Sequence, residues 1–410
     1  MVSNHQAKNV VPSSTNFTGG ESLAEPSYQV SRPSPSTARV VAWLSWTHFL
    51  NDGIANYLPG VIPFILSERH IPEALAGTLM TALGLGQGLQ PVAGWIADRI
   101  GGRALVLGGV ALSTVSAAVI GWTHPLWLLL CFLLFTGIGN TSFHPQALSL
   151  TRQQLKNKPG VGMAVFLVGG EIGRSLGPLA AGLVVHRWGL AWIWLLALPL
   201  IISYPWIVKW VPPQVRRTDA KSPLKLQRHL KAGLALLSYT FVRSGVIYEI
   251  TTLTPLMWHH RGGGLVTGAA LVTIFIGIGI VGNLMGGALD DRIGKSAVLY
   301  GASALAAISL VAFIFLQGFW EWPVLGIMGI ALFGSATTTM LVGQDIFAEN
   351  PALGSGIALG LANALGAVMA FPLTYIAARS GAATAVWILI ALTIVTIPAI
   401  RWMPLKRRST

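Results

Sequence analysis

Hydrophobic residues in this chain gather in long runs that short polar segments separate. Each run has about 20 residues or more, which is the length that a helix needs to cross the hydrocarbon core of a bilayer. Twelve runs can be distinguished, at approximately 40–67, 75–97, 103–122, 126–150, 160–186, 190–211, 232–258, 265–289, 296–317, 322–345, 352–378 and 382–403. The pattern predicts an all-α membrane protein with twelve transmembrane helices.

One connection is longer than the others and divides the predicted helices six and six. Residues 212–231 read PPQVRRTDAKSPLKLQRHLK, a polar, basic and proline-containing stretch. We therefore expect an N-terminal six-helix bundle over 39–211, a cytoplasmic linker over 212–231 and a C-terminal six-helix bundle over 232–403. Residues 1–38 are rich in Ser, Pro, Asn and Thr and are expected to form a disordered cytoplasmic tail, and 404–410 a second tail.

Composition supports a membrane protein and explains the excess of positive charge. Of the 410 residues, 53% are hydrophobic and only 10% are charged, against roughly 25% charged in a soluble domain. The formal net charge is +13. Lysine and arginine concentrate on the side of the tails, while the opposite loops hold only Arg69, Arg187, Arg261 and Arg379. Basic residues favour the cytoplasmic side, so we expect both termini in the cytoplasm and no binding of nucleic acid.

Motifs for enzymatic chemistry are not recognisable in the sequence. A Walker loop for ATP is absent, and His259 and His260 lack acidic or cysteine partners at metal-binding spacing. The single cysteine, Cys131, lies in an apolar run and has no partner for an internal disulfide. We therefore expect neither an enzyme nor a cofactor or metal.

A short motif occurs twice, each time after the second predicted helix of a six-helix half. Residues 94–101 read GWIADRIG and residues 287–294 read GALDDRIG. The aspartate of such a loop can meet the positive N-terminus of a neighbouring helix, and the basic residues can pair across the inner interface. We expect these loops to gate the inner side, through Gly94, Asp98, Arg99, Gly101 and Arg103 and through Gly287, Asp291, Arg292 and Gly294. The alternative is that the charges only set topology and turns.

A weaker echo supports a duplicated six-helix unit. Gly173, Gly177 and Pro178 in the fifth predicted helix have counterparts in Gly366, Ala370 and Pro372 of the eleventh. Parallel repeats of this kind occur in transporters that bind substrate near the bilayer midplane, between the two halves.

These motifs resemble those of a known family. The two DRIG loops resemble the signature loop of the major facilitator superfamily, and GRSLGPLAAG at 173–182 resembles the fifth-helix motif of its proton-coupled drug exporters. A closer likeness is to the fosmidomycin resistance branch, through HFLND at 48–52, LQPVAG at 89–94, FHP at 143–145 and VGG at 168–170. The resemblance implies the two-bundle fold of that superfamily and export of small toxic molecules in exchange for protons. The chain departs from the pattern at Leu133, Gln146, Glu171 and Arg174.

The first predicted helix carries a histidine, an asparagine and an aspartate in the stretch VVAWLSWTHFLNDGIANYLPGVIPFIL, residues 40–66. An aspartate at a helix centre costs roughly 2.5–3.5 kcal/mol on membrane-insertion scales. Asp52 falls close to the midplane at about 1.5 Å rise per residue, with His48 one turn away on the same face and Asn51 on an adjacent face.

Burial favours the neutral form of a carboxyl group, so Asp52 could take a proton from one side and release it to the other. A neighbouring histidine can share that proton. Our hypothesis is that Asp52 and His48 form the proton-coupling site. The alternative is an aspartate that is permanently paired for structural reasons.

Other polar residues inside the predicted helices are candidates to line a substrate cavity. Glu171 and Arg174 can pair along one helix face, or Arg174 can meet an anionic substrate. A buried arginine such as Arg243 needs a carboxylate or an anion, and Asp52 is its expected partner because the first and seventh helices face the central cavity in the fold that the resemblance implies. His144 could line the cavity or be structural. The full set is Asn51, His144, Glu171, Arg174, Arg243, Tyr248, Glu249 and Asn363.

The sequence thus predicts a secondary transporter of a bacterial cytoplasmic membrane that works by alternating access on protons and a small-molecule substrate. We expect a monomer that exports drug-like or anionic molecules. Proton-linked uptake of a metabolite or organic acid is one alternative. A membrane sensor or scaffold that does not transport is another.

Overall fold

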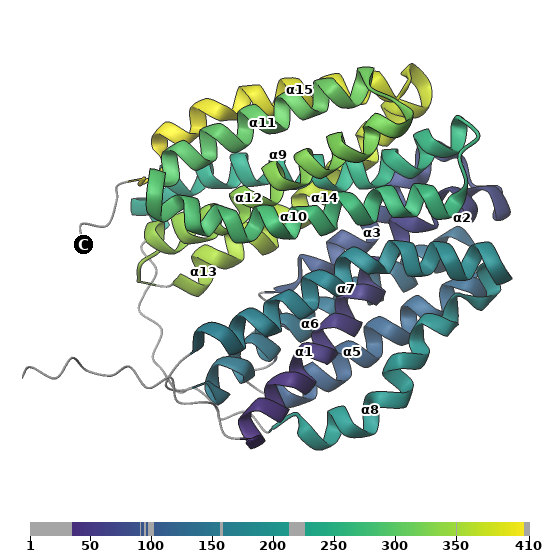
Figure 1. Ribbon diagram of the computed structural model, residues 1–410, viewed down its shortest axis with the longest axis horizontal. Coiled ribbons are helices and arrows are strands. Elements are labelled where there is room, and N and C mark those ends of the chain that lie inside the picture. The colour runs from purple at the N-terminus through teal and green to yellow at the C-terminus, as the bar shows by residue number, and fades with distance from the viewer. Residues whose placement is uncertain are drawn as a thin grey trace, which may run out of the picture.

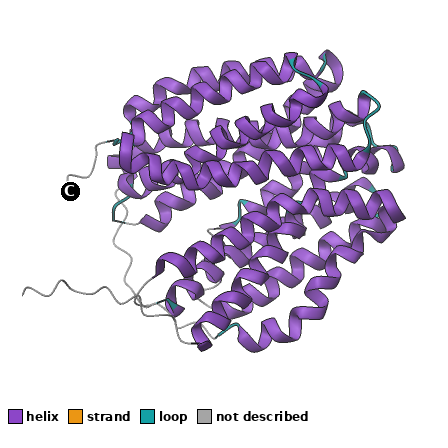
Figure 2. Cartoon of the chain, viewed as in Figure 1, coloured by secondary structure: helices purple, strands orange, loops and turns teal. Residues whose placement is uncertain are grey.

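The computed structural model describes residues 35–90, 92–93, 96, 102–155, 159–212, 226–349 and 351–405. The ordered segments within these ranges are helices, and none of the described residues forms a β-strand (Figure 2). Several predictions lie outside the described residues. They concern the tail before residue 35, Gly94, Asp98, Arg99 and Gly101 of the first gating loop, linker residues 213–225, and residues 406–410.

One group of helices is built from the first half of the described chain (Figure 1). It contains α1 (Pro35–Ala55), η1 (Leu58–Gly60), α2 (Ile62–Glu68), η2 (Glu73–Leu75), α3 (Ala76–Gln87), α5 (Gly102–Val119), η3 (Ile120–Trp122), α6 (Leu126–Gln154), α7 (Pro159–Trp188), η4 (Leu190–Ala197) and α8 (Leu198–Trp210). Two clusters of buried apolar side chains hold this group together, one around Ile62, Leu79 and Leu133 and one around Val110 and Phe143.

The second group follows the linker. It contains α9 (Leu226–His260), α10 (Leu265–Ile293), α11 (Lys295–Phe315), η5 (Gly318–Trp320), α12 (Glu321–Ile346), α13 (Pro351–Ser355), the π-helical turn η6 (Gly356–Leu361), α14 (Ala362–Ser380), α15 (Ala382–Thr396) and η7 (Ile397–Trp402). Its core also has two clusters, one around Phe275, Leu310 and Met328 and one around Leu236 and Val342. We refer to the two groups as the N-half and the C-half.

Nine helical segments among the described residues are long and apolar enough to cross a membrane. The predicted spans at 40–67, 75–97 and 160–186 are not among those nine. Their helices are α1 with α2, which carry His48 and Asp52; α3, which adjoins residues outside the description; and α7, which carries Glu171 and Arg174. Ionisable residues lower the mean hydropathy of a helix, and two of these segments, α1 and α7, carry ionisable residues in their interior.

The predicted continuous helix over 40–67 is wrong in one respect. α1 ends at Ala55 and α2 begins at Ile62, with the short 3-10 helix η1 between them. Pro59 lies in η1 and Pro63 at the start of α2. Since proline lacks a backbone N–H and its ring clashes with the preceding turn, the α-helix is interrupted here.

The two halves meet at one end of the molecule and separate toward the other (Figure 1). We call the end at which α2 lies the closed end, and the opposite end, from which α1 starts, the terminal end. Near the closed end, Nε2 of His260 in the C-half lies 2.8 Å from Oε2 of Glu73 in the N-half. Glycines allow close packing between the halves: a Cβ on Gly77 of α3 would lie 2.2 Å from the carbonyl oxygen of Ala370 in α14.

Candidate functional site

Asp52 lies at the centre of a cluster of polar side chains from α1 and α6. Its Oδ1 lies 3.1 Å from Nε2 of His144, and its Oδ2 lies 3.3 Å from Nε2 of His48. The side-chain amides of Asn140 and Asn51 donate to the same Oδ1 at 3.1 and 3.3 Å. Four side chains, those of His48, Asn51, Asn140 and His144, therefore converge on one carboxyl group inside the N-half.

His48 is fixed from the side opposite Asp52. Its Nδ1 lies 2.8 Å from the carbonyl oxygen of Phe166 in α7, and the Phe166 ring stacks on the imidazole at 4.4 Å between centroids. A carbonyl oxygen only accepts hydrogen bonds, so Nδ1 of His48 carries the hydrogen. The histidine is therefore held with Nε2 facing the Asp52 carboxyl group.

This arrangement requires a proton between His48 and Asp52. With Nδ1 protonated, a neutral imidazole presents a lone pair at Nε2. A lone pair facing a carboxylate oxygen at 3.3 Å is repulsive, so either His48 is an imidazolium or Asp52 is a neutral acid. This geometry therefore favours one proton on the pair, carried by Nε2 of His48 or by the Asp52 carboxyl group.

Glycines of α7, within the fifth-helix motif and just before it, create the space for this pair. A Cβ on Gly173 would lie 2.0 Å from the carbonyl oxygen of Phe49, and one on Gly177 would lie 2.3 Å from that of Gly53. A Cβ on Gly170 would lie 2.3 Å from Nε2 of His48. The motif therefore brings the backbones of α1 and α7 together, and Gly170 leaves room for the imidazole.

One side of the cluster is accessible to solvent and the other is buried. His48, Asn51 and Asp52 are buried, whereas the His144 side chain retains 29% of its accessible surface. Because His144 contacts Asp52 directly, it connects the buried carboxyl group to the accessible part of the site.

Glu171 and Arg174 form the loose pair that their spacing predicted. Nη1 of Arg174 lies 4.0 Å from Oε2 of Glu171, and both side chains are about a quarter exposed. The Arg174 guanidinium lies over the ring of Phe333 in α12, 5.1 Å from its centroid. Arg174 therefore contacts Phe333 of the C-half in addition to its ion pair with Glu171 on α7.

Two other candidates also lie at or near the contact between the halves. The hydroxyl of Tyr248 in α9 donates to Oε1 of Gln87 in α3 at 2.8 Å. Asn363 of α14 accepts a hydrogen bond from Ser244 of α9 through its Oδ1 at 2.7 Å. The first of these hydrogen bonds joins the two halves, and the second lies within the C-half.

Arg243 does not pair with Asp52, contrary to the sequence-based expectation. Its Nη1 donates to the carbonyl oxygen of Leu332 in α12 at 3.3 Å, and no ion pair links it to any described carboxylate. The depth of Arg243 along α9 was foreseeable from the sequence, but the direction of its side chain depends on packing within the C-half. Asp52 instead finds its partners among the histidines and asparagines of its own half.

Glu249 is completely buried in the interface of α9 with α14. The hydroxyl of Thr374 lies 3.2 and 3.3 Å from its two carboxyl oxygens. In this conformation the carboxyl group therefore contacts a neighbouring helix rather than open space.

Basic residues near the predicted gating loops bond within their own halves. Nη2 of Arg103 donates to the carbonyl oxygen of Val208 at 2.6 Å, and Lys295 pairs with Asp345. Neither of these two bonds crosses the interface between the halves in this conformation. Gly287 and Arg292 lie in α10, Asp291 is exposed there, and Gly294 ends the helix with φ of 88°, a conformation that favours glycine.

His48, Asp52 and His144 also form a group that could hold a metal, since their ligand atoms lie within 4.8 Å of one another. His48 donates its other ring nitrogen to a carbonyl, as metal-binding histidines do. The same three groups satisfy one another by hydrogen bonds and a shared proton, so the arrangement does not require a metal.

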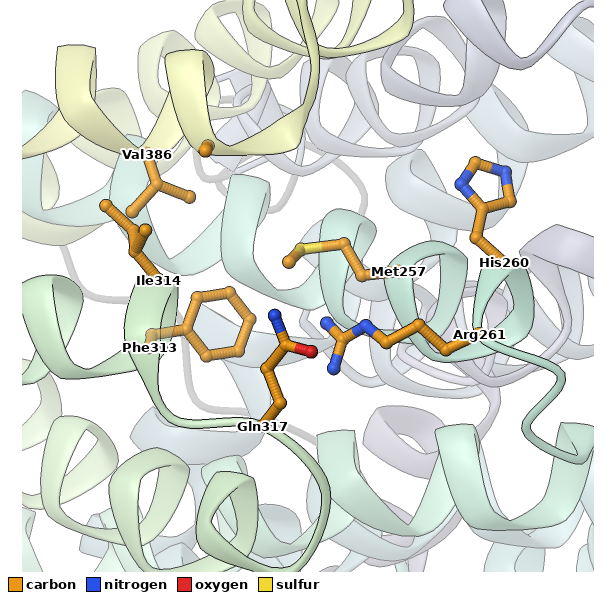
Figure 3. Close-up of a pocket in the computed structure, with 8 residues that line it drawn as sticks. Met257, His260, Arg261, Phe313, Ile314, Gln317 and Val386 are labelled. Atoms are coloured by element: carbon orange, nitrogen blue, oxygen red, sulfur yellow. The ribbon is translucent and has the colours of Figure 1, made fainter.

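A cavity of about 220 Å³ lies away from this cluster, in the C-half near the closed end. Figure 3 shows Met257, Phe313, Ile314 and Val386 around it, with the Arg261 guanidinium directed toward Gln317. Arg261 is paired with Glu321. The cavity includes none of the residues that the sequence predicted for the proton-coupling site or the substrate cavity.

The sequence analysis did not identify two residues that bond to candidate site residues. Asn140 precedes His144 by one helical turn, and Gln87 follows an apolar run in α3. Both are uncharged amides, which give a weaker signal in an apolar segment than a charged residue does. The i, i+4 spacing of Asn140 and His144 was the feature that could have revealed the first.

Comparisons with known proteins agree with this architecture. The sequence model of the Major Facilitator Superfamily matches residues 44–370. The chain is 22% identical over 361 residues to the "Uncharacterized MFS-type transporter YfnC" of Bacillus subtilis, which covers 84% of this chain and 88% of the relative. It is 24% identical over 349 residues to the "Fosmidomycin resistance protein" of Escherichia coli, covering 82% and 86% respectively.

Solved structures share the fold at low sequence identity. The nucleoside transporter NupG superposes with a TM-score of 0.73 at 12% identity, over 88% of this chain and 98% of NupG. A bacterial homolog of the human lysosomal transporter Spinster gives a TM-score of 0.68 at 14% identity, over 90% and 98%. These relatives are transporters and not enzymes, as expected from the sequence. The chain is a multi-pass membrane transporter with two six-helix halves, and it belongs to the major facilitator superfamily.

Proposed function

We propose that the chain is a proton-coupled exporter of small drug-like or anionic molecules, working by alternating access with both termini in the cytoplasm. The observation that carries the proposal is the geometry of His48, whose Nδ1 faces the Phe166 carbonyl oxygen while its Nε2 faces the Asp52 carboxyl group. A buried group that can hold one proton in two places is suited to proton uptake on one side of the membrane and release on the other.

His144 is the expected entry point for that proton. It is the most exposed member of the cluster and contacts Oδ1 of Asp52, while His48 contacts Oδ2. A proton can pass from His144 to the carboxyl group and on to His48 without a large movement of the backbone. Motion of α1 against α6 would change these contacts and so change the proton affinity of the site.

The substrate is expected between the halves, near Arg174, Tyr248 and Asn363. Arg174 supplies a positive charge and Phe333 an aromatic face, which together suit an anionic or amphiphilic molecule. The names of two relatives, the Fosmidomycin resistance protein of Escherichia coli and the Multidrug resistance protein MdtG of Citrobacter koseri, support small toxic molecules as the cargo.

A resistance assay tests this proposal. The chain and its Asp52→Asn variant are expressed at matched membrane abundance in a sensitised bacterium that lacks its major efflux pumps. We expect the unmodified chain to raise resistance to a member of a panel that contains fosmidomycin, other phosphonates and hydrophobic cations. Asp52→Asn should abolish that resistance, because the amide cannot exchange a proton.

Glu68→Gln provides the matched control, since it removes one carboxylate at an exposed site outside the cluster. It should keep full resistance. Proton-dependent resistance that survives unchanged in Asp52→Asn would disprove the coupling role of Asp52.

Import by the same machinery is the second candidate function. Arg174, partly exposed and only loosely paired, favours an organic acid as its cargo. An importer predicts that deletion of the gene slows growth on one nutrient rather than raising drug sensitivity. Purified protein that moves neither substrate nor protons in liposomes would instead favour a sensor or scaffold.

A further inference from the structure

Arg243 is a buried cation whose positive charge no described carboxylate compensates. Its residue is 7% exposed, its Nε has no hydrogen-bond partner, and its Nη1 reaches only the carbonyl oxygen of Leu332. The C-half carboxylates with described partners bond elsewhere: Glu249 to Thr374, Asp290 to Thr338, Glu321 to Arg261, Asp345 to Lys295 and Glu349 to His229.

An arginine in this position has no way to neutralise itself. A buried carboxyl group can become neutral by taking up a proton, but a guanidinium remains charged in proteins. A charged side chain inside the membrane region usually pairs with an opposite charge. The structure therefore calls for a negative charge near Arg243 that the described protein groups do not supply.

A small cavity adjoins the unsatisfied guanidinium inside the C-half. Its volume is about 20 Å³, and its polar lining consists of Tyr239, Arg243, Ser303, Ser335, Thr393 and Thr396, from α9, α11, α12 and α15. A space of this size holds a particle about as large as one water molecule. It excludes a drug-sized molecule or an organic acid.

The lining offers further donors besides the guanidinium. Tyr239 lies one turn before Arg243 on α9, and its hydroxyl reaches the carbonyl oxygen of Leu299 only at 3.5 Å, the long limit of a hydrogen bond. Ser303 already donates to that carbonyl at 2.8 Å. Oγ of Ser303 also lies 3.2 Å from the Tyr239 hydroxyl. When Ser303 donates to Tyr239, the Tyr239 hydrogen can turn from the Leu299 carbonyl oxygen toward an anion.

We propose that this cavity binds a small monovalent inorganic anion, with chloride as the abundant candidate, held by Nε of Arg243 and the hydroxyl of Tyr239. The anion compensates the charge of Arg243 and stabilises the packing of α9 against α11, α12 and α15. It is separate from the Asp52 cluster, which lies in the N-half, and does not depend on the direction or substrate of transport.

Thermal unfolding of the purified full chain in detergent tests the site. Sodium chloride is exchanged for sodium gluconate at constant ionic strength, and the melting temperature is followed against chloride concentration. We expect a saturable rise of several degrees with chloride and with bromide. Gluconate and sulfate should give none, since neither fits a cavity of about 20 Å³.

Two variants assign the effect to the cavity. Arg243→Gln should remove the dependence on chloride, and Tyr239→Phe should raise the half-saturating concentration at least threefold. Tyr57→Phe is the matched control, because Tyr57 is a buried tyrosine of the N-half that donates to the carbonyl oxygen of Ala117. It should respond to chloride as the unmodified chain does.

Three results would overturn the proposal. The first is an equal melting temperature in chloride and gluconate, as expected if water alone fills the cavity. The second is a rise with chloride that persists unchanged in Tyr239→Phe, which decides the matter even if Arg243→Gln does not fold. The third is an equal rise with large anions. None of these measurements involves transport, so they stand apart from the test of Asp52.

Discussion

Gly170 gives the His48 imidazole its position beside Asp52. The glycine lies in α7 directly against the ring, with the site of a Cβ only 2.3 Å from Nε2. A side chain can change its rotamer to avoid an added methyl group, whereas the backbone of a packed helix cannot move away as easily. A methyl group at residue 170 should therefore leave the fold intact and displace the ring from the carboxyl group.

Gly170→Ala is expected to lower proton-driven transport at least about tenfold, as misplacing a functional group by about 1 Å can do. The amount of folded protein in the membrane should stay unchanged. Transport of a substrate by the chain in liposomes under an imposed pH gradient is the measurement. Gly108→Ala is the control, because a Cβ on that α5 glycine meets nothing within 4 Å. Equal transport by the two variants would show that the position of His48 does not matter for coupling.

Charge inside apolar segments is the most conspicuous signal at the residue scale. His48, Asp52 and His144 were identifiable because titratable groups are rare in apolar segments, and the structure brings all three together. The expected partner of Arg243 was wrong, because spacing fixes depth along a helix but not how two helices are rotated against each other. The proton shared by His48 and Asp52 depends on the Phe166 carbonyl, a backbone group to which the sequence gives no clue.

The packing of α1 against α7 depends on close backbone contact along the fifth-helix motif. Gly173 faces the carbonyl oxygen of Phe49, and Gly177 faces that of Gly53. In a bilayer, helices gain little from burying apolar surface, so close approach and good packing become the main source of association. The corresponding Gly366 of α14 lies against Ser244 and Gly245 of α9. The two glycines that correspond in sequence, Gly173 and Gly366, therefore both lie at close contacts between helices.

Gly173→Ala is expected to destabilise the protein by about 1–3 kcal/mol, the usual cost of overpacking. The new methyl group would meet backbone 2.0 Å away, which cannot turn aside as the His48 ring can. Thermal unfolding in detergent should show a lower melting temperature. Gly301→Ala of α11, which meets nothing within 4 Å, should melt at the same temperature or slightly higher, since alanine favours helix more than glycine does.

If Gly173→Ala melted at the same temperature as Gly301→Ala, the motif would have a role other than close packing.

Hydrophobic runs alone do not show where a helix is interrupted. The run over 40–67 contains enough apolar residues for one span, yet the structure divides it at η1, because Pro59 and Pro63 act through backbone geometry and not through hydrophobicity.

The molecule as a whole is joined at its closed end and separates toward its terminal end (Figure 1). His260 and Glu73 link the halves there, and Thr81 of α3 donates to the carbonyl oxygen of Ala367 in α14 at 2.7 Å. Alternating access in transporters built from repeats is largely a rocking of one half against the other. The alternating access that we propose for this chain requires that the contacts at the closed end break once in every transport cycle.

Tying the halves together at this end should stop that cycle. In a Cys131→Ser background, the variant Glu73→Cys/His260→Cys is treated with a short bifunctional thiol reagent that dithiothreitol can remove. Both positions are accessible to a reagent in water, with exposed side-chain fractions of 35% and 59%. Cross-linking should lower transport at least about tenfold if rocking is required, and reduction should restore it.

Cross-linking within one half provides the control. Arg69→Cys/His124→Cys places the same reagent at the closed end of the N-half, where Nη1 of Arg69 lies 2.8 Å from Nδ1 of His124. This cross-link does not join the halves, so transport should continue. Transport that also continues with Glu73→Cys/His260→Cys fully cross-linked would mean that the closed end stays closed, and that substrate reaches the other side without separation of the halves. Such a result would rule out a rocking cycle for this chain while leaving the proton site at Asp52 open to its own test.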